Sequence, residues 1–213
     1  MNKKFIPHLF SFGKKGEGFT LIESLITIAI FILGLAAITG SIFGLYRAYY
    51  YTFQQTQAIE EARNGVEIMV KQIREAKQGD DGAYIIEKAD DYEFIFYSDI
   101  DKDNETERVR YFIVGADFKQ GVIKPIGSPL EYIIEPTNPL YSERISILSK
   151  YVRNLPPIFH YFDGDENELP APARLKDTKT MRVYLVVNVD PNKSQQNFIL
   201  ESEVLLRNLK TNL

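Results

Sequence analysis

Two hydrophobic patterns follow one another in the first part of the chain. Residues 19–46 are almost entirely without charge, the exception being Glu23, and this run of 28 residues exceeds the roughly 18 that indicate a membrane span. Beyond it, small and apolar residues recur at steps of three and four, which places them on one helical face opposite a charged face. That face is formed by Ala58, Ala62, Val66, Met69, Ile73 and Ala76.

One helix can carry both patterns. No proline lies between Pro7 and Pro125, so nothing in the segment forbids a continuous helix. Gly79, which two aspartates follow, is a typical stop signal. We therefore predict a single helix over residues 19–77, with an apolar first half and an amphipathic second half.

The rest of the chain has the pattern of short strands. Aromatic and β-branched runs alternate with clusters of Gly, Asp and Asn, and the connections are too short for crossover helices, so we expect an antiparallel sheet. Segment 136–157 contains four prolines and is expected to be irregular, with a strand or short helix over 144–153. The expected strands are 84–86, 92–97, 109–114, 132–134, 158–162, 182–189 and 198–206.

These elements predict an α+β fold. A sheet of this kind needs a cover for its apolar face, and the helical face from Ala58 to Ala76 is the obvious candidate. The expected architecture is therefore a long N-terminal helix, transmembrane in its first half, packed through its second half on an antiparallel β-sheet.

Charge is distributed unevenly along the chain. Four lysines precede the apolar run, whereas its far side opens with only Arg47, so the positive-inside rule predicts a cytoplasmic N-terminus and an extracytoplasmic C-terminal part. A cleaved secretory signal is not expected, because its apolar region would span only about 7–15 residues. The part after residue 18 is net acidic, which argues against a nucleic-acid partner. The chain has no cysteine, which excludes disulfides and thiolate metal sites.

The junction before the apolar run carries a specific motif. Residues 14–23 read KKGEGFTLIE. This resembles the cleavage and methylation signature of the type IV pilin family, which includes the pseudopilins of type II secretion. The resemblance implies that a prepilin peptidase cuts after Gly18, that the new N-terminus at Phe19 is N-methylated, and that Glu23 is the assembly residue. It also implies a pilin-like fold.

Physical reasoning about the same residues leaves two roles for Glu23. Gly18 has no Cβ, so an extended backbone can enter a protease cleft there without a clash. Cleavage leaves an ammonium group, and Glu23 in lipid needs such a cation, on its own or a neighbouring subunit. Alternatively, Thr20 and Glu23 form a helix capping box. The two roles can also act one before and one after polymerisation.

The resemblance divides the chain into four parts. These are a basic leader (1–18), a transmembrane and filament-core helix (19–46), its amphipathic continuation (47–79) and a β-rich ectodomain (80–213). Many pilins carry a proline in mid-span, where this chain has Gly34, Gly40 and Gly44. Glycines there could allow bending, or they could serve as small-residue contacts between helices, and the sequence leaves both open.

The ectodomain narrows the resemblance. A large β-rich part, the sequence Phe162-Asp163-Gly164-Asp165 and a last strand ending Leu206-Arg207-Asn208 resemble the J-type minor pseudopilins of type II secretion. The function expected is a minor subunit near the tip of a pseudopilus, anchored once in the cytoplasmic (inner) membrane before assembly. Two alternatives remain: a minor pilin of a type IV pilus, and a singly anchored extracytoplasmic binding protein. The expected partners are a prepilin peptidase, other pilin-like or minor pseudopilin subunits, the inner-membrane assembly platform and membrane lipid.

An acidic segment raises the question of calcium. Asp99, Asp101 and Asp103 alternate like the opening of a calcium loop, but the full pattern would need glycine at Asn104 and glutamate at Arg110. The competing hypothesis is a solvated, acidic hairpin turn. The later Asp163–Asn167 segment starts with Asp-Gly, which is typical of a turn.

Candidate catalytic residues are few. The chain has two histidines: His8 lies in the leader and His160 stands between two aromatics in an expected strand, where a structural role is the simpler hypothesis. The sequence contains no phosphate loop, nucleophile elbow or metal-spaced histidine pair. We therefore expect neither an enzyme nor a cofactor.

Overall fold

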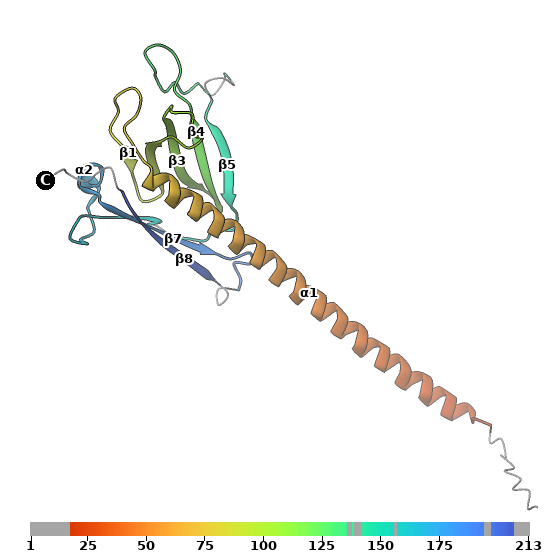
Figure 1. Cartoon of the computed structure of the whole chain (residues 1–213). Helices are drawn as coiled ribbons and strands as arrows, with labels where there is room; N and C mark the ends of the chain where they lie inside the picture. The colour runs from red at the N-terminus through yellow and green to blue at the C-terminus, as the bar shows by residue number, and fades with distance from the viewer. Residues whose placement is uncertain (1–17, 136–137, 139–141, 156, 194–196, 207–213) are drawn as a thin grey trace, which may run out of the picture. The chain divides into compact units, whose positions relative to one another are not determined.

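The computed structural model describes residues 18–135, 138, 142–155, 157–193 and 197–206 (Figure 1). The predicted leader therefore lies outside the described residues, except for Gly18. The chain forms two compact units, one ending at Tyr49 and the other beginning at Tyr50. The elements are α1 (Leu21–Arg74), β1 (Ile86–Ala89), β2 (Glu93–Ser98), β3 (Glu107–Val114), β4 (Asp117–Ile123), β5 (Arg144–Ser149), β6 (Phe159–Phe162), η1 (Ala171–Ala173), α2 (Arg174–Asp177), β7 (Thr180–Val187) and β8 (Phe198–Leu205).

The long helix is confirmed, but it ends earlier than predicted. It runs without interruption for 54 residues and ends at Arg74 rather than Lys77. After the last turn, the backbone hydrogen bonds join residues three apart instead of four. Glu75 N–H and Ala76 N–H donate to the carbonyls of Gln72 and Ile73. Lys77 N–H then donates to the Tyr97 carbonyl of β2 at 2.9 Å, so contact with the sheet ends the helix before Gly79.

The strands form two antiparallel sheets. One contains β1 to β5 in chain order, and the other has the order β6-β7-β8. The α+β fold is thus confirmed, whereas the expectation of one sheet is wrong. Between the sheets Tyr151 has a positive φ of 62°, and Val152 forms a bridge to Val187 of the second sheet. This local turn redirects the chain from one sheet to the other.

Several strand predictions need correction. β4 was not expected, because its polar residues and Gly121 conceal a strand whose pairing with β3 and β5 buries it. The strand expected at 132–134 is absent, and the nearest pairing is an isolated bridge between Ile126 and Glu131. β1 begins at Ile86, where the predicted strand 84–86 ends, and the ambiguous segment 144–153 contributes strand β5.

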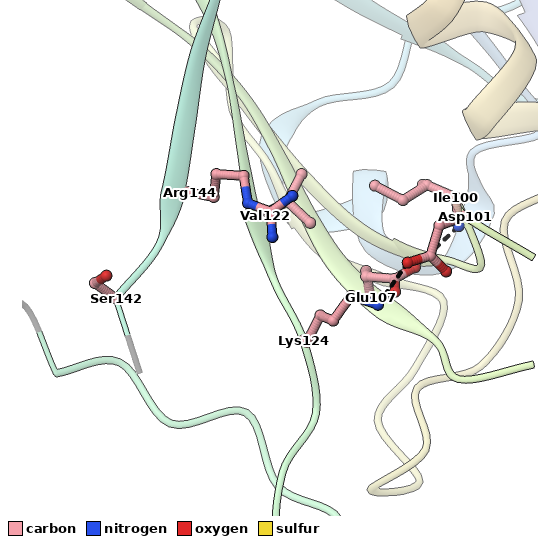
Figure 2. A pocket seen from close by; sticks show the side chains of 7 residues that line it. All are labelled: Ile100, Asp101, Glu107, Val122, Lys124, Ser142 and Arg144. Carbon is pink, nitrogen blue, oxygen red and sulfur yellow. Dashed lines mark hydrogen bonds and ion pairs between the residues drawn. The ribbon is translucent and has the colours of Figure 1, made fainter. Parts of the chain in front are cut away.

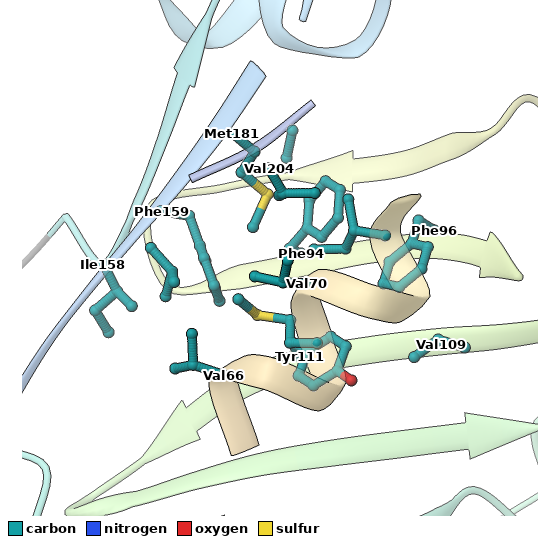
Figure 3. Packing of buried hydrophobic residues seen from close by; sticks show 14 of the residues in the cluster. Val66, Val70, Phe94, Phe96, Val109, Tyr111, Ile158, Phe159, Met181 and Val204 are labelled. Atoms are coloured by element: carbon teal, nitrogen blue, oxygen red, sulfur yellow. The ribbon is translucent and has the colours of Figure 1, made fainter. Parts of the chain in front are cut away.

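The core lies around the second half of α1. The predicted face is confirmed, since each of its members from Ala58 to Ala76 is buried. Figure 3 shows this part of the helix, marked by Val66 and Val70, beside aromatic side chains from both sheets. The largest fully buried side chains include Tyr111, Tyr161, Phe94, Phe96, Phe118 and Phe159.

Candidate processing and assembly site

Thr20 and Glu23 form a reciprocal capping box at the start of α1. The Glu23 N–H donates to Thr20 Oγ1 at 3.3 Å, and the Thr20 hydroxyl and N–H donate to Glu23 Oε2 at 3.3 and 3.5 Å. Ser24 N–H donates to the Thr20 carbonyl at 3.1 Å, which is the first bond of the helix. The capping role that the sequence left open is therefore present in the isolated chain. A capping box uses the carboxylate as an acceptor and equally accepts glutamine at this position.

The first half of α1 carries apolar side chains on all sides. None of the described residues from Gly18 to Tyr49 is buried, and the exposed ones include Leu21 at 87% and Phe19 at 73%. A helix that is apolar all round is stable when lipid or other helices cover it. Within the described part of the chain, α1 is the one helix long and apolar enough to span a membrane, and its position near the N-terminus fits a single-pass anchor.

Three hydroxyl groups of this segment bond within the helix. Thr27, Thr39 and Ser41 donate to carbonyls four residues earlier, those of Glu23, Leu35 and Ala37, at 2.8, 2.7 and 2.9 Å. These bonds satisfy each donor internally, as a helix in lipid requires. The first half of α1 can therefore contact hydrocarbon or a neighbouring helix without leaving these donors unpaired.

The glycines of this unit have no packing role within the described chain. A Cβ added at Gly18, Gly34, Gly40 or Gly44 would meet no heavy atom within 4 Å beyond its local backbone. The helix also continues through the last three of them. Packing within the described chain thus gives no reason for glycine at these positions, so the choice between bending and contacts with other helices depends on the assembled state.

The acidic segment forms the hairpin between β2 and β3. Asp101 and Asp103 both accept from Lys124 Nζ, which lies 2.8 Å from Asp103, and this ammonium group together with the Glu105 N–H lowers the Asp103 pKa. Asn104 has a positive φ of 75°, so it takes the conformation for which the calcium-loop pattern prefers glycine. The hairpin expected from the sequence is present, with Lys124 across it.

The structure adds Glu107 to this acidic group. One carboxylate oxygen each from Asp99, Asp101 and Glu107 lie within 4.8 Å of one another. Sequence reasoning missed Glu107 because the calcium-loop pattern places its last ligand at Arg110, whereas this hairpin closes three residues earlier. The signal was a carboxylate in an otherwise aromatic and β-branched strand.

The remaining sequence candidates have local structural contacts. Asp163 accepts the N–H groups of Asp165 and Asn167 at 2.8 and 2.9 Å, which forms a turn and lowers its pKa. His160 lies in β6 with Nδ1 2.7 Å from Glu168 Oε1. Neither arrangement brings a nucleophile and a base together.

Comparison with known families finds a match in the N-terminal part of the chain. The family model for the prokaryotic N-terminal methylation motif matches residues 13–39, which contain the junction and most of the apolar run. This motif is the type IV pilin signature, and it indicates a type IV pilin-like protein that is processed by prepilin peptidase and assembles with other pilins. The family consists of structural subunits. No curated protein matches the chain.

Proposed function

We propose that the protein is a minor pseudopilin, a structural subunit that joins a pseudopilus near its tip and serves type II protein secretion. Prepilin peptidase cuts between Gly18 and Phe19, the Phe19 amine is methylated, and the apolar half of α1 then leaves the inner membrane for a filament of related helices. The observation that carries this proposal is the single carboxylate of Glu23 in the first turn of α1, whose first half has an apolar surface that no other described part of the chain buries.

Glu23 has a specific role in this proposal. In lipid the carboxylate is tolerated because the capping box and the nearby interface stabilise it. In a filament it would lie among apolar helices, where a charge persists only when it is paired. The N-terminal amine of a neighbouring subunit is a suitable partner, and this contact would fix the axial register between subunits.

The first test concerns the cleavage position. Gly18→Val adds a side chain that no described part of the chain obstructs, so the fold should be unchanged. Mass spectrometry of the protein from its host should find the wild type beginning at methylated Phe19 and the variant with its leader intact. An intact leader on the wild type would contradict the proposal and favour a singly anchored binding protein that does not polymerise.

The second test separates capping from assembly at Glu23. Glu23→Gln keeps a capping acceptor but removes the charge, whereas Thr20→Val removes the capping hydroxyl but keeps the charge. We expect the Gln variant to insert in the membrane and be cleaved but to enter filaments at less than about a tenth of the wild-type level, roughly the effect of 1.4 kcal/mol. Thr20→Val should assemble at near the wild-type level.

Immunoblots of sheared filament fractions and of membranes measure both populations. If Thr20→Val is lost from filaments and Glu23→Gln is retained, then capping is the main role of Glu23 and the pairing hypothesis is wrong.

A third experiment tests the secretion role against the type IV pilus alternative. Deletion of the gene should reduce release of extracellular enzymes while leaving surface pili and twitching motility intact. The opposite result would identify the protein as a minor pilin. Both results retain a pilin-like filament subunit.

A further inference from the structure

The hairpin between β2 and β3 brings three carboxylates to one place. Asp99 and Asp101 lie just after β2, and Glu107 opens β3 opposite Ser98. One oxygen of each carboxylate lies within 4.8 Å of the other two. Carboxylate groups at this separation repel one another unless a cation lies between or beside them.

Glu107 provides a separate observation that points to a ligand. Its side chain is 0% exposed, and its Oε2 accepts the Ile100 N–H at 2.9 Å. Its other oxygen, Oε1, has no hydrogen-bond donor among the described residues, and Lys124 Nζ lies 3.6 Å from it. A buried carboxylate oxygen without a donor is costly, so this atom has an unfilled requirement for positive charge.

A pocket borders this group of side chains. It has a volume of about 450 Å³, and Figure 2 shows Asp101, Glu107 and Lys124 converging at one side of it. The pocket therefore brings solvent to the exposed Asp101 and Lys124, and an ion would reach the buried Glu107 Oε1 when Lys124 turns away. The pocket is lined by Ile100, Asp101, Glu107, Val122, Lys124, Ser142 and Arg144.

The Lys124 ammonium group is a cation beside these carboxylates that a metal ion could replace. Its ammonium group contacts Asp101, Asp103 and, at 3.6 Å, Glu107, and the hydrogen bonds that it donates to the two aspartates raise its pKa. The lysine side chain itself is 42% exposed and is attached by a flexible stem, so it can turn to solvent. A divalent ion would neutralise the carboxylates more completely than one ammonium group.

We propose that Asp99, Asp101 and Glu107 bind a calcium ion, and that Lys124 takes the place of its charge when calcium is absent. The donors are all oxygens, which suit hard cations, and calcium accepts the irregular, partly hydrated shell that three carboxylates and water provide. Because Lys124 must be displaced, the affinity belongs to the weak range of extracellular calcium modules, with a Kd of about 10⁻⁴–10⁻³ M. The site does not depend on filament assembly.

Calorimetric titration of the full chain in mild detergent with CaCl₂ tests this proposal. Lys124→Gln removes the competing charge and should tighten binding about tenfold, whereas Glu107→Gln and the exposed Asp101→Asn should each weaken it at least about tenfold. Glu105→Gln is the matched control, because the exposed Glu105 lies in the same hairpin but belongs neither to the donor set nor to the ion pairs of Lys124, and it should change Kd by less than about threefold. The same titration with MgCl₂ should show weaker binding.

The change in stability on adding calcium is a readout that a purely structural role of Glu107 would not affect. Glu107 Oε1 is buried without a donor beside the other carboxylates, so Glu107→Gln removes an incompletely paired charge. Without calcium at pH 7, the variant should therefore unfold at a higher temperature than the wild type. In millimolar calcium the wild type should gain about 2–4 °C and the variant should gain nothing.

Two results would overturn the proposal. One is the absence of binding heat for both the wild type and Lys124→Gln at 10-fold the expected Kd. The other is a loss of affinity in Glu105→Gln as large as that in Glu107→Gln, which would point to the exposed loop as a diffuse acidic surface.

Discussion

Individual residues of the first sheet are joined by ion pairs that are only partly accessible to water. Arg108 is 8% exposed and donates through Nε and Nη2 to both oxygens of Glu87, at 2.6 and 2.7 Å. The Tyr97 hydroxyl donates to the same carboxylate at 2.7 Å. Burial raises the Glu87 pKa, but the bonds from Arg108 and Tyr97 outweigh that effect and leave it below its ordinary 4.5.

Arg108→Leu should destabilise the protein by about 1–3 kcal/mol at pH 7, because it leaves Glu87 charged without its main partner. A lowered carboxyl pKa stabilises the fold above the ordinary pKa, and that contribution is lost as pH falls through the lowered value. The difference between wild type and variant should therefore narrow between pH 5 and pH 3. Urea unfolding followed by tyrosine fluorescence measures this difference in the free energy of unfolding.

Arg182→Leu is the control for this prediction. Arg182 forms exposed pairs with Glu201 and Glu203 in the second sheet, and such pairs contribute about 0–1 kcal/mol. A loss for Arg108→Leu that stays equally large at pH 3 would mean that the packing of the arginine stem, not its charge, is what matters.

For single residues, some roles could be predicted from the sequence and others could not. Thr20 and Glu23 could be identified because a capping box depends on residues three apart in one helix. Glu107 could not be assigned to the acidic group, because its position depends on the register that pairs it with Ser98 of β2. Strand register is set by tertiary pairing, which a local pattern does not contain.

The amphipathic half of α1 was the most predictable element. Its small and apolar face recurs at helical spacing, and the face alone determines which side is buried. β4 was the least predictable, since Lys119, Gln120 and Gly121 interrupt its apolar residues and it is recognised only between its two neighbours. The division into two sheets has a similar cause, because it depends on the turn at Tyr151 rather than on the strands themselves.

α1 and β5 approach each other closely at Gly65. A Cβ at this position would lie 2.9 Å from the Leu148 Cβ, so a larger residue must displace one of the two elements. Gly65→Val should lower stability by about 1–3 kcal/mol through overpacking. Thermal unfolding followed by circular dichroism in detergent measures the loss.

Gly40→Ala provides the comparison on the same helix. Gly40 has no neighbour within 4 Å in the described chain, so alanine should leave the unfolding temperature unchanged or slightly raised. Equal destabilisation by both substitutions would mean that the contact with Leu148 is not the cause.

For the whole molecule, the structure separates folding from assembly. The residues that hold the second unit together lie after Tyr50, whereas the apolar surface of the first unit has no cover within the described chain. The motif at residues 13–39 could be recognised from sequence because it is local and contiguous. Neighbouring subunits could not be recognised from the sequence, because their contacts involve other chains.

Gly40→Leu tests whether the glycines are contact points between helices. The substitution should leave membrane insertion, cleavage and unfolding temperature unchanged, because nothing in the described chain lies near Gly40. If Gly40 and Gly44 form a close approach between helices, the amount of the variant in filaments should fall several-fold. Incorporation at the wild-type level would favour bending as the role of these glycines.

The internally bonded hydroxyls of Thr27, Thr39 and Ser41 bear on the mechanics of such a filament. A helix surface whose hydroxyl donors are already used in internal hydrogen bonds contacts its neighbours through complementary shape and dispersion forces. These contacts change little in energy when one rod slides a short way along another. A fibre built from such rods should therefore extend under small tension, and the Glu23 contacts proposed above would return it to register on release, which stretching a single fibre with an optical trap would measure.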